Sequence, residues 1–196
     1  MTSGISNKII ALAKALRVFG LRKEASDIEA LPNSANATVF SSILKMMPAN
    51  PPTDLQNKLS GYFEENKLKK IDADRLHITL LHQDVLRPFS KAIKGKEIPQ
   101  YTGSITYGGV YSIKRKGDKG DRESVFVVIK EQEDIARYVE DVLESLGLEK
   151  DLREKTRTYH ISLANMTGTP DQSVGHSETS PMTIAESGDI SKYLAI

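Results

Sequence analysis

Two of the four histidines stand in the same local pattern, an imidazole followed two residues later by a hydroxyl. His77 and Thr79 form the first pair, and His160 and Ser162 form the second, with apolar residues between and after them. Composition alone produces two such matches among four histidines in roughly 0.3% of sequences. The repetition therefore favours a shared role. The alternative is a pair of structurally unrelated strand histidines.

These residue types suit general acid–base chemistry at a phosphodiester. Histidine titrates near neutral pH, so one imidazole can accept a proton while a second one donates. Neighbouring hydroxyls donate hydrogen bonds to anionic oxygens. Phosphodiester cleavage needs a base for the attacking oxygen, an acid for the leaving oxygen and donors for the phosphoryl oxygens, and it requires no metal ion. His77, Thr79, His160 and Ser162 supply these parts.

Both patterns fit β-strands, in which alternate residues share a face. The expected strands cover residues 75–82 and 156–163. In each strand, the apolar residues around the motif are expected to face the core, while the imidazole and the hydroxyl share the opposite face. Each strand would thus present one histidine and one hydroxyl together.

The remaining pattern predicts helices and strands around these two segments. Further strands are expected over 38–46, 104–114 (with a bend or bulge at Gly108-Gly109), 124–130 and 182–185. Helices are expected over 54–69, 84–94 and 133–146, with a polar hairpin loop at 116–122 and a loop or lid at 165–180. Residues 1–32 read as a helical hairpin appended to a domain of residues 37–196, across a linker at 33–37.

Composition narrows the class of protein. The chain has 196 residues, 39% of them hydrophobic, which suits one domain with a short appendage. The absence of cysteine excludes disulfides, zinc–thiolate sites and thiol nucleophiles. A net charge of +1 argues against coating nucleic acid by electrostatics alone. No long apolar run or secretory signal stands out, so a cytoplasmic protein, or a viral one in the host cytoplasm, is expected, without membrane contact.

On the two motifs, the chain resembles the 2H phosphoesterase superfamily. The hallmark of that family is two His-x-Thr/Ser motifs, separated by roughly the 83 residues between His77 and His160. The resemblance covers residues 37–185 and implies an α+β, bilobal fold, with two antiparallel sheet halves flanking a central cleft and helices outside. It also implies that His77 and His160 form the acid–base pair, that Thr79 and Ser162 bind phosphate, and that no metal or other cofactor takes part.

The resemblance also indicates a class of substrate. Members of the family include RNA 2′,3′-cyclic phosphodiesterases, 2′,5′-oligoadenylate phosphodiesterases and phage enzymes that destroy cyclic-oligonucleotide defence signals. The implied substrate is a small nucleotide, a cyclic oligonucleotide or an RNA end, with no obligatory protein partner. The near-neutral charge favours a small substrate over long RNA. Which histidine is the base stays open.

Four other residues are candidate substrate contacts, each with a structural alternative. Tyr107 and Tyr111 have rings that can stack on bases, or can simply pack in a strand. Lys114 opens a cationic loop that suits a phosphate clamp or a solvated hairpin tip. Asn165 follows the second motif and suits substrate contact or turn formation. His82 is expected at a strand end.

Two other classes of function remain open at this point. A non-catalytic module would bind nucleotide or RNA through the same cleft, without turnover. A structural or partner-binding protein would instead dock through residues 1–32.

Overall fold

A computed structural model describes residues 36–40, 43–115, 122–153, 158–170, 173 and 188–194. The predicted helical hairpin at 1–32, the strand at 182–185, the loop at 116–121 and most of the predicted lid lie outside these residues. The elements in chain order are β1 Asn36–Phe40, β2 Ile43–Met47, α3 Thr53–Lys58, α4 Ser60–Glu65, β3 Lys69–Lys70, η1 Ala73–Arg75, β4 Ile78–Leu81, α5 Gln83–Leu86, η2 Arg87–Phe89, α6 Ser90–Ile93, β5 Tyr107–Arg115, β6 Arg122–Ile129, α7 Gln132–Ser145, η3 Lys150–Leu152, β7 His160–Asn165, β8 Gly188–Asp189 and η6 Ser191–Leu194.

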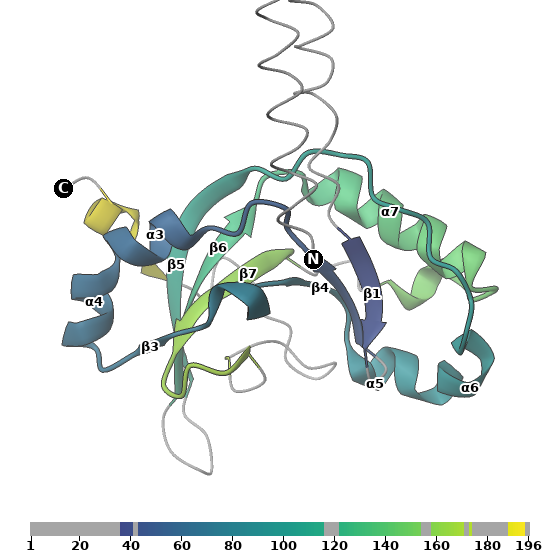
Figure 1. Ribbon diagram of the computed structural model, residues 1–196, viewed down its shortest axis with the longest axis horizontal. Coiled ribbons are helices and arrows are strands. Elements are labelled where there is room, and N and C mark those ends of the chain that lie inside the picture. The colour runs from purple at the N-terminus through teal and green to yellow at the C-terminus, as the bar shows by residue number, and fades with distance from the viewer. Residues whose placement is uncertain are drawn as a thin grey trace, which may run out of the picture.

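Within the described residues the fold is α+β, built on one eight-stranded antiparallel sheet (Figure 1). Its main strand order is β1-β2-β4-β7-β6-β5-β8, and β3 pairs with β7 off this path. The two motif strands are therefore direct neighbours at the centre of the sheet, although they are far apart in sequence. Between them the ladder holds only at Ile78 and Ile161, whereas β6 and β7 pair from Ser124–Asn165 to Val128–His160. We call the β4–β7 junction the seam.

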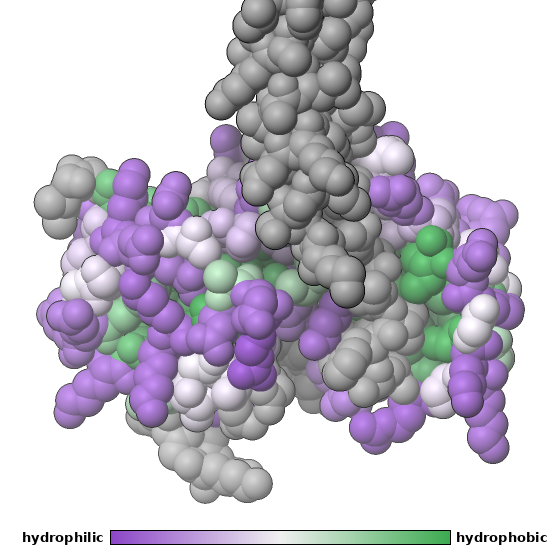
Figure 2. Space-filling view, viewed as in Figure 1, coloured by the Kyte–Doolittle hydropathy of each residue, from purple (hydrophilic) through white to green (hydrophobic). Residues whose placement is uncertain are grey.

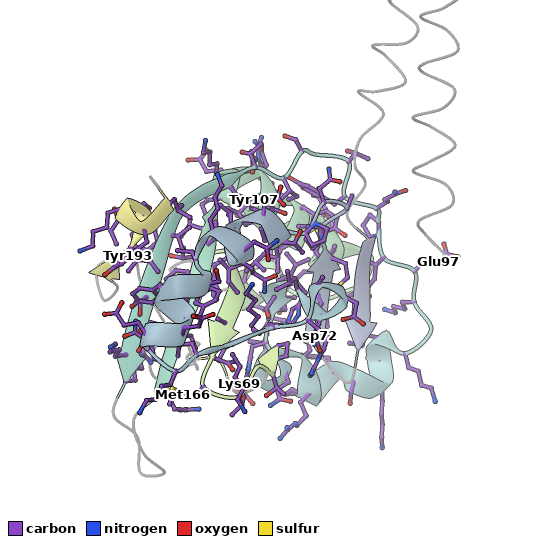
Figure 3. All side chains as sticks on the ribbon, turned by 60° about the vertical axis from the view of Figure 1, so that its left-hand side comes forward. Lys69, Asp72, Glu97, Tyr107, Met166 and Tyr193 are labelled. Atoms are coloured by element: carbon purple, nitrogen blue, oxygen red, sulfur yellow. The ribbon has the colours of Figure 1, made fainter. Side chains whose placement is uncertain are left out.

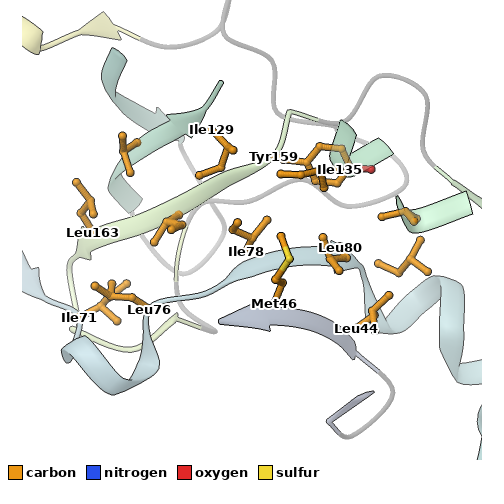
Figure 4. Packing of buried hydrophobic residues seen from close by; sticks show 14 of the residues in the cluster. Leu44, Met46, Ile71, Leu76, Ile78, Leu80, Ile129, Ile135, Tyr159 and Leu163 are labelled. Atoms are coloured by element: carbon orange, nitrogen blue, oxygen red, sulfur yellow. The ribbon is translucent and has the colours of Figure 1, made fainter. Parts of the chain in front are cut away.

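One face of the sheet carries the hydrophobic core. The close view in Figure 4 shows inward side chains of β2, β4 and β7 gathered on that face. Leu44 and Met46 of β2 and Ile78 and Leu80 of β4 are fully buried there. Helix α7 covers the same core with Ile135 and four further buried side chains of its apolar stripe. The stripe predicted over 133–146 is thus confirmed, with bounds that differ by one residue at each end.

Two expected elements were wrong in a way that local sequence explains. The single strand predicted over 38–46 is two strands, β1 and β2, which pair antiparallel. In the sequence, Ser41-Ser42 interrupts the apolar run between Phe40 and Ile43. The helix predicted over 54–69 is two short helices, α3 and α4, and it ends near Asn66. Lys67 then adopts a φ of 55°, which no helix continues.

Other expectations hold more closely. The register between β5 and β6 shifts between Tyr107 and Val110, which confirms the bulge predicted at Gly108-Gly109. The predicted strand 75–82 begins later, because Ala73–Arg75 forms a 3₁₀ turn. The strand predicted over 156–163 is β7, His160–Asn165.

The surface seen in Figure 2 is mainly polar, with hydrophobic residues showing as small patches between purple side chains. Among the large hydrophobic side chains that the structure describes, only that of Met166 is exposed to solvent. None of the described helices is long and apolar enough to cross a membrane.

Candidate active site on the seam

The seam brings the four motif residues together on one face of the sheet. The antiparallel register pairs Ile78 with Ile161. Strand alternation then turns His77 and Thr79 of one segment, and His160 and Ser162 of the other, to the face opposite these two isoleucines. The two imidazoles therefore lie on one face of the sheet, on either side of the seam.

Burial confirms the predicted alternation in both motifs. The residues that flank the motif positions are each exposed by 2% or less. They are Leu76, Ile78, Leu80, Tyr159, Ile161 and Leu163. The imidazoles and hydroxyls between them are half-buried. Core packing of the alternate residues therefore holds the two strands so that the motif side chains face away from the core.

Each imidazole makes the same kind of hydrogen bond, to the backbone carbonyl two residues before it. Nδ1 of His77 lies 2.8 Å from the carbonyl oxygen of Arg75, and Nδ1 of His160 lies 2.8 Å from that of Thr158. A carbonyl oxygen only accepts, so Nδ1 must carry the proton in each ring. In the neutral form, Nε2 then holds the lone pair. In each ring the nitrogen able to accept a proton is therefore Nε2, and the hydrogen bond of Nδ1 to its own strand sets the ring orientation.

The surroundings of His77 favour its neutral form. Burial lowers the pKa of the His77 imidazole below its ordinary value, and the positive charges of Lys45 and Arg75 lower it further. The hydrogen bond to the Arg75 carbonyl acts in the opposite direction. An imidazole that is neutral near pH 7 has the protonation state that a general base needs.

An aromatic wall lies beside His160. The ring of Phe126 on β6 meets the His160 ring edge-on, with centroids 5.1 Å apart. Tyr111 on β5 stacks on Phe126 with centroids 5.8 Å apart and an interplanar angle of 24°. The registers Ser162–Phe126 and Phe126–Tyr111 place both rings on the motif face. Tyr111 thus joins the candidate site through Phe126, which sequence reasoning did not single out.

Lys45 also lies on the motif face and was missed. The register places Lys45 of β2 opposite Thr79. Its neighbours Leu44 and Met46 are fully buried in the core, so alternation turns Lys45 to the other side. Its charge acts on His77. The alternation Leu-Lys-Met was the signal available in the sequence.

The structure does not bring Lys114 and Tyr107 to this face. Lys114 shares the core face of β5 with Val110, and its Nζ lies 3.1 Å from Oε2 of buried Glu123. Oε1 of Glu123 accepts hydrogen bonds from Ser112 Oγ and Tyr62 OH, at 2.6 and 3.0 Å. Lys114 is thus part of a polar network on the far side of the sheet.

Tyr107 packs against the main core, and its hydroxyl donates to the Asn50 carbonyl. Burial raises its pKa to about 12, so the phenol stays protonated. Tyr107 lies well apart from Lys69 and Met166 in Figure 3, where all three residues are labelled.

Asn165 forms a turn with both its donors engaged. Its Nδ2 donates to Thr169 O at 2.6 Å and to Ser173 Oγ at 2.9 Å. Its Oδ1 accepts from the backbone N–H of Thr167 and of Gly168, at 2.9 and 2.7 Å. The side chain is fully buried. The turn-forming alternative therefore describes this residue in the structure.

His82 ends strand β4 as expected. Its Nδ1 lies 2.9 Å from the Asp84 carboxylate, at the start of α5. His176 lies outside the described residues. Within the ranges that the structure describes, no three His, Asp or Glu side chains gather as metal ligands.

Comparisons with known proteins add no information about this site. No family model, curated protein or solved structure matches the chain.

Proposed function

We propose that the chain is a phosphodiesterase that cleaves nucleotide phosphodiesters by paired histidine acid–base catalysis, without a metal ion. The observation that carries the proposal is the matched pair of imidazoles on one face of the seam. Each ring is held by its own strand through the same kind of Nδ1 hydrogen bond, and each shares the motif face with the hydroxyl two residues further along its strand. Two unrelated strand histidines would have no reason to share this arrangement.

The proposed mechanism assigns a role to each group. His77 is the base, because its environment favours the neutral ring, and its Nε2 takes the proton from the attacking hydroxyl or water. His160 is the acid and gives a proton to the leaving oxygen. Thr79 and Ser162 donate hydrogen bonds to the non-bridging oxygens, where negative charge grows in the transition state.

We also propose that the fold is that of the 2H phosphoesterase superfamily. In this proposal, the seam is the boundary between the family's two sheet halves. The short β4–β7 ladder and the position of both motifs beside it support this assignment. The central cleft expected for the family would then lie over the motif face.

A turnover assay in EDTA tests the proposal. The panel holds 2′,3′-cyclic mononucleotides, RNA ending in a cyclic phosphate, 2′,5′-linked oligoadenylate and cyclic dinucleotides. His77→Gln and His160→Gln should each lower the rate by about 10²–10⁴. His82→Gln is the matched control, because His82 caps α5, and it should retain the wild-type rate within about threefold.

Three outcomes would count against the proposal. Loss of activity in EDTA would contradict the metal-free mechanism. Full activity in both motif variants would contradict the acid–base roles. Binding of one member of the panel without cleavage of any would favour a nucleotide-binding module.

A further inference from the structure

The motif residues are symmetric about the seam. An antiparallel pair has a local two-fold axis through its centre, here between Ile78 and Ile161. Rotation about this axis exchanges one histidine with the other, and the threonine with the serine. A phosphate between the two imidazoles would therefore meet nearly the same groups from both sides.

The next strands outward break this symmetry. The same rotation exchanges the β2 residue that pairs with Thr79 and the β6 residue that pairs with Ser162. These residues are Lys45 on β2 and Phe126 on β6. One side of the candidate site thus carries an ammonium group, and the equivalent position on the other side carries an aromatic ring that stacks on Tyr111.

This difference restricts the two alcohol portions of a bound phosphodiester. The portion directed toward β6 and β5 meets the half-buried ring of Tyr111, which stacks on buried Phe126 and against which a nucleobase packs well. The portion directed toward β2 meets a cation, which favours an anionic group. A 2′,3′-cyclic mononucleotide has one nucleoside and one phosphate, so it would leave one of these two sides unused.

We infer that Lys45 holds a second phosphate of the substrate, next to the phosphodiester that is cleaved. The substrate class is then a dinucleotide or longer oligonucleotide, linear or cyclic, rather than a cyclic mononucleotide. This inference rests on the proposed function for its site and names the substrate of that site. The positive charge of Lys45 also lowers the pKa of His77, in keeping with the position of Lys45 beside Thr79.

Binding of dinucleotides without a 2′-hydroxyl tests the inference independently of turnover. The ligands are d(ApA), d(pApA) and d(ApAp), with the guanine series beside them, measured by calorimetry on the full chain. The wild-type chain should bind one terminally phosphorylated form about tenfold or more tightly than the unphosphorylated form, as expected for a charge-assisted contact. Lys45→Met keeps the aliphatic stem and should lose this preference, while binding the unphosphorylated form as before.

Two matched variants complete the experiment. Lys45→Arg keeps the charge and should keep the preference. Lys58→Gln removes an equal charge from the exposed last residue of helix α3 and should bind like the wild type. Circular dichroism of each variant checks that it is folded.

The inference is overturned in any of three cases: Lys45→Met retains the preference, Lys45→Met weakens all ligands equally, or the wild type shows no preference. A preference that depends on Lys45 in a chain without turnover would leave the inference standing and remove the proposed catalysis. Turnover by a chain that shows no preference for a phosphorylated ligand would leave the proposed catalysis standing and remove the inference about Lys45.

Discussion

Replacing Asn165 with alanine separates a turn-forming role from a substrate contact. The fully buried amide donates two hydrogen bonds and accepts two from backbone N–H groups, and the turn that it forms holds Gly168 at a φ of 78°. A hydrogen bond contributes about 1 kcal/mol net, and water can reach the exposed partner Thr167. We therefore expect Asn165→Ala to lower the free energy of unfolding by about 2–3 kcal/mol.

Urea unfolding measures this change, with turnover of the same preparation measured below the transition. Asn66→Ala is the matched control, because the Asn66 side chain donates a single hydrogen bond, to Tyr62 O at 2.9 Å. It should lower the free energy of unfolding by about 1 kcal/mol or less. Folded Asn165→Ala should keep kcat/KM within about threefold. A loss of stability below about 1 kcal/mol, together with a fall in kcat/KM of more than about tenfold, would refute the structural role.

Four further predictions concern the site and the far face of the sheet. Because burial lowers the pKa of His77, the acid limb of kcat/KM should lie below the ordinary histidine value of 6.5, and a limb at or above it would contradict the base role. For the same reason, the free energy of unfolding should decrease as the pH falls through about 6.5, because His77 of the unfolded chain then binds a proton that native His77 does not. Urea unfolding at a series of pH values measures this decrease, and His77→Gln should remove the part that comes from His77. Thr79→Ala and Ser162→Ala should each lower kcat by about 10–10³, and unchanged kinetics would exclude phosphate binding by these hydroxyls. Lys114→Gln should leave turnover unchanged, because the Lys114 ammonium pairs with Glu123 on the core face. A tenfold fall in the turnover rate would show instead that Lys114 contacts the substrate.

The motif face could be predicted from sequence because alternation is a local property. Each motif places an apolar residue on either side of a polar one, and the burial of Ile78 and Ile161 follows that pattern. The run Val125–Ile129 has no polar alternation, so its sequence hides which residues face the site. Phe126 was missed for that reason, since only the register with β7 places it on the motif face.

Pairing between distant strands also could not be predicted from sequence. The sheet order that makes β4 and β7 neighbours depends on non-local contacts, which one sequence does not contain. The same limit affects Lys114 and Tyr107, because the bulge at Gly108-Gly109 decides which residues of β5 share a face.

The central claim is that His77 and His160 act as one unit on one phosphodiester. A double-mutant cycle tests it most directly, with the rate of the chemical step measured at saturating substrate for wild type, His77→Gln, His160→Gln and the double variant. Residues that act as a unit are strongly non-additive, so the double variant should be no slower than the slower single variant by more than about threefold. Losses that multiply in the double variant, or a single variant with the wild-type rate, would contradict the account.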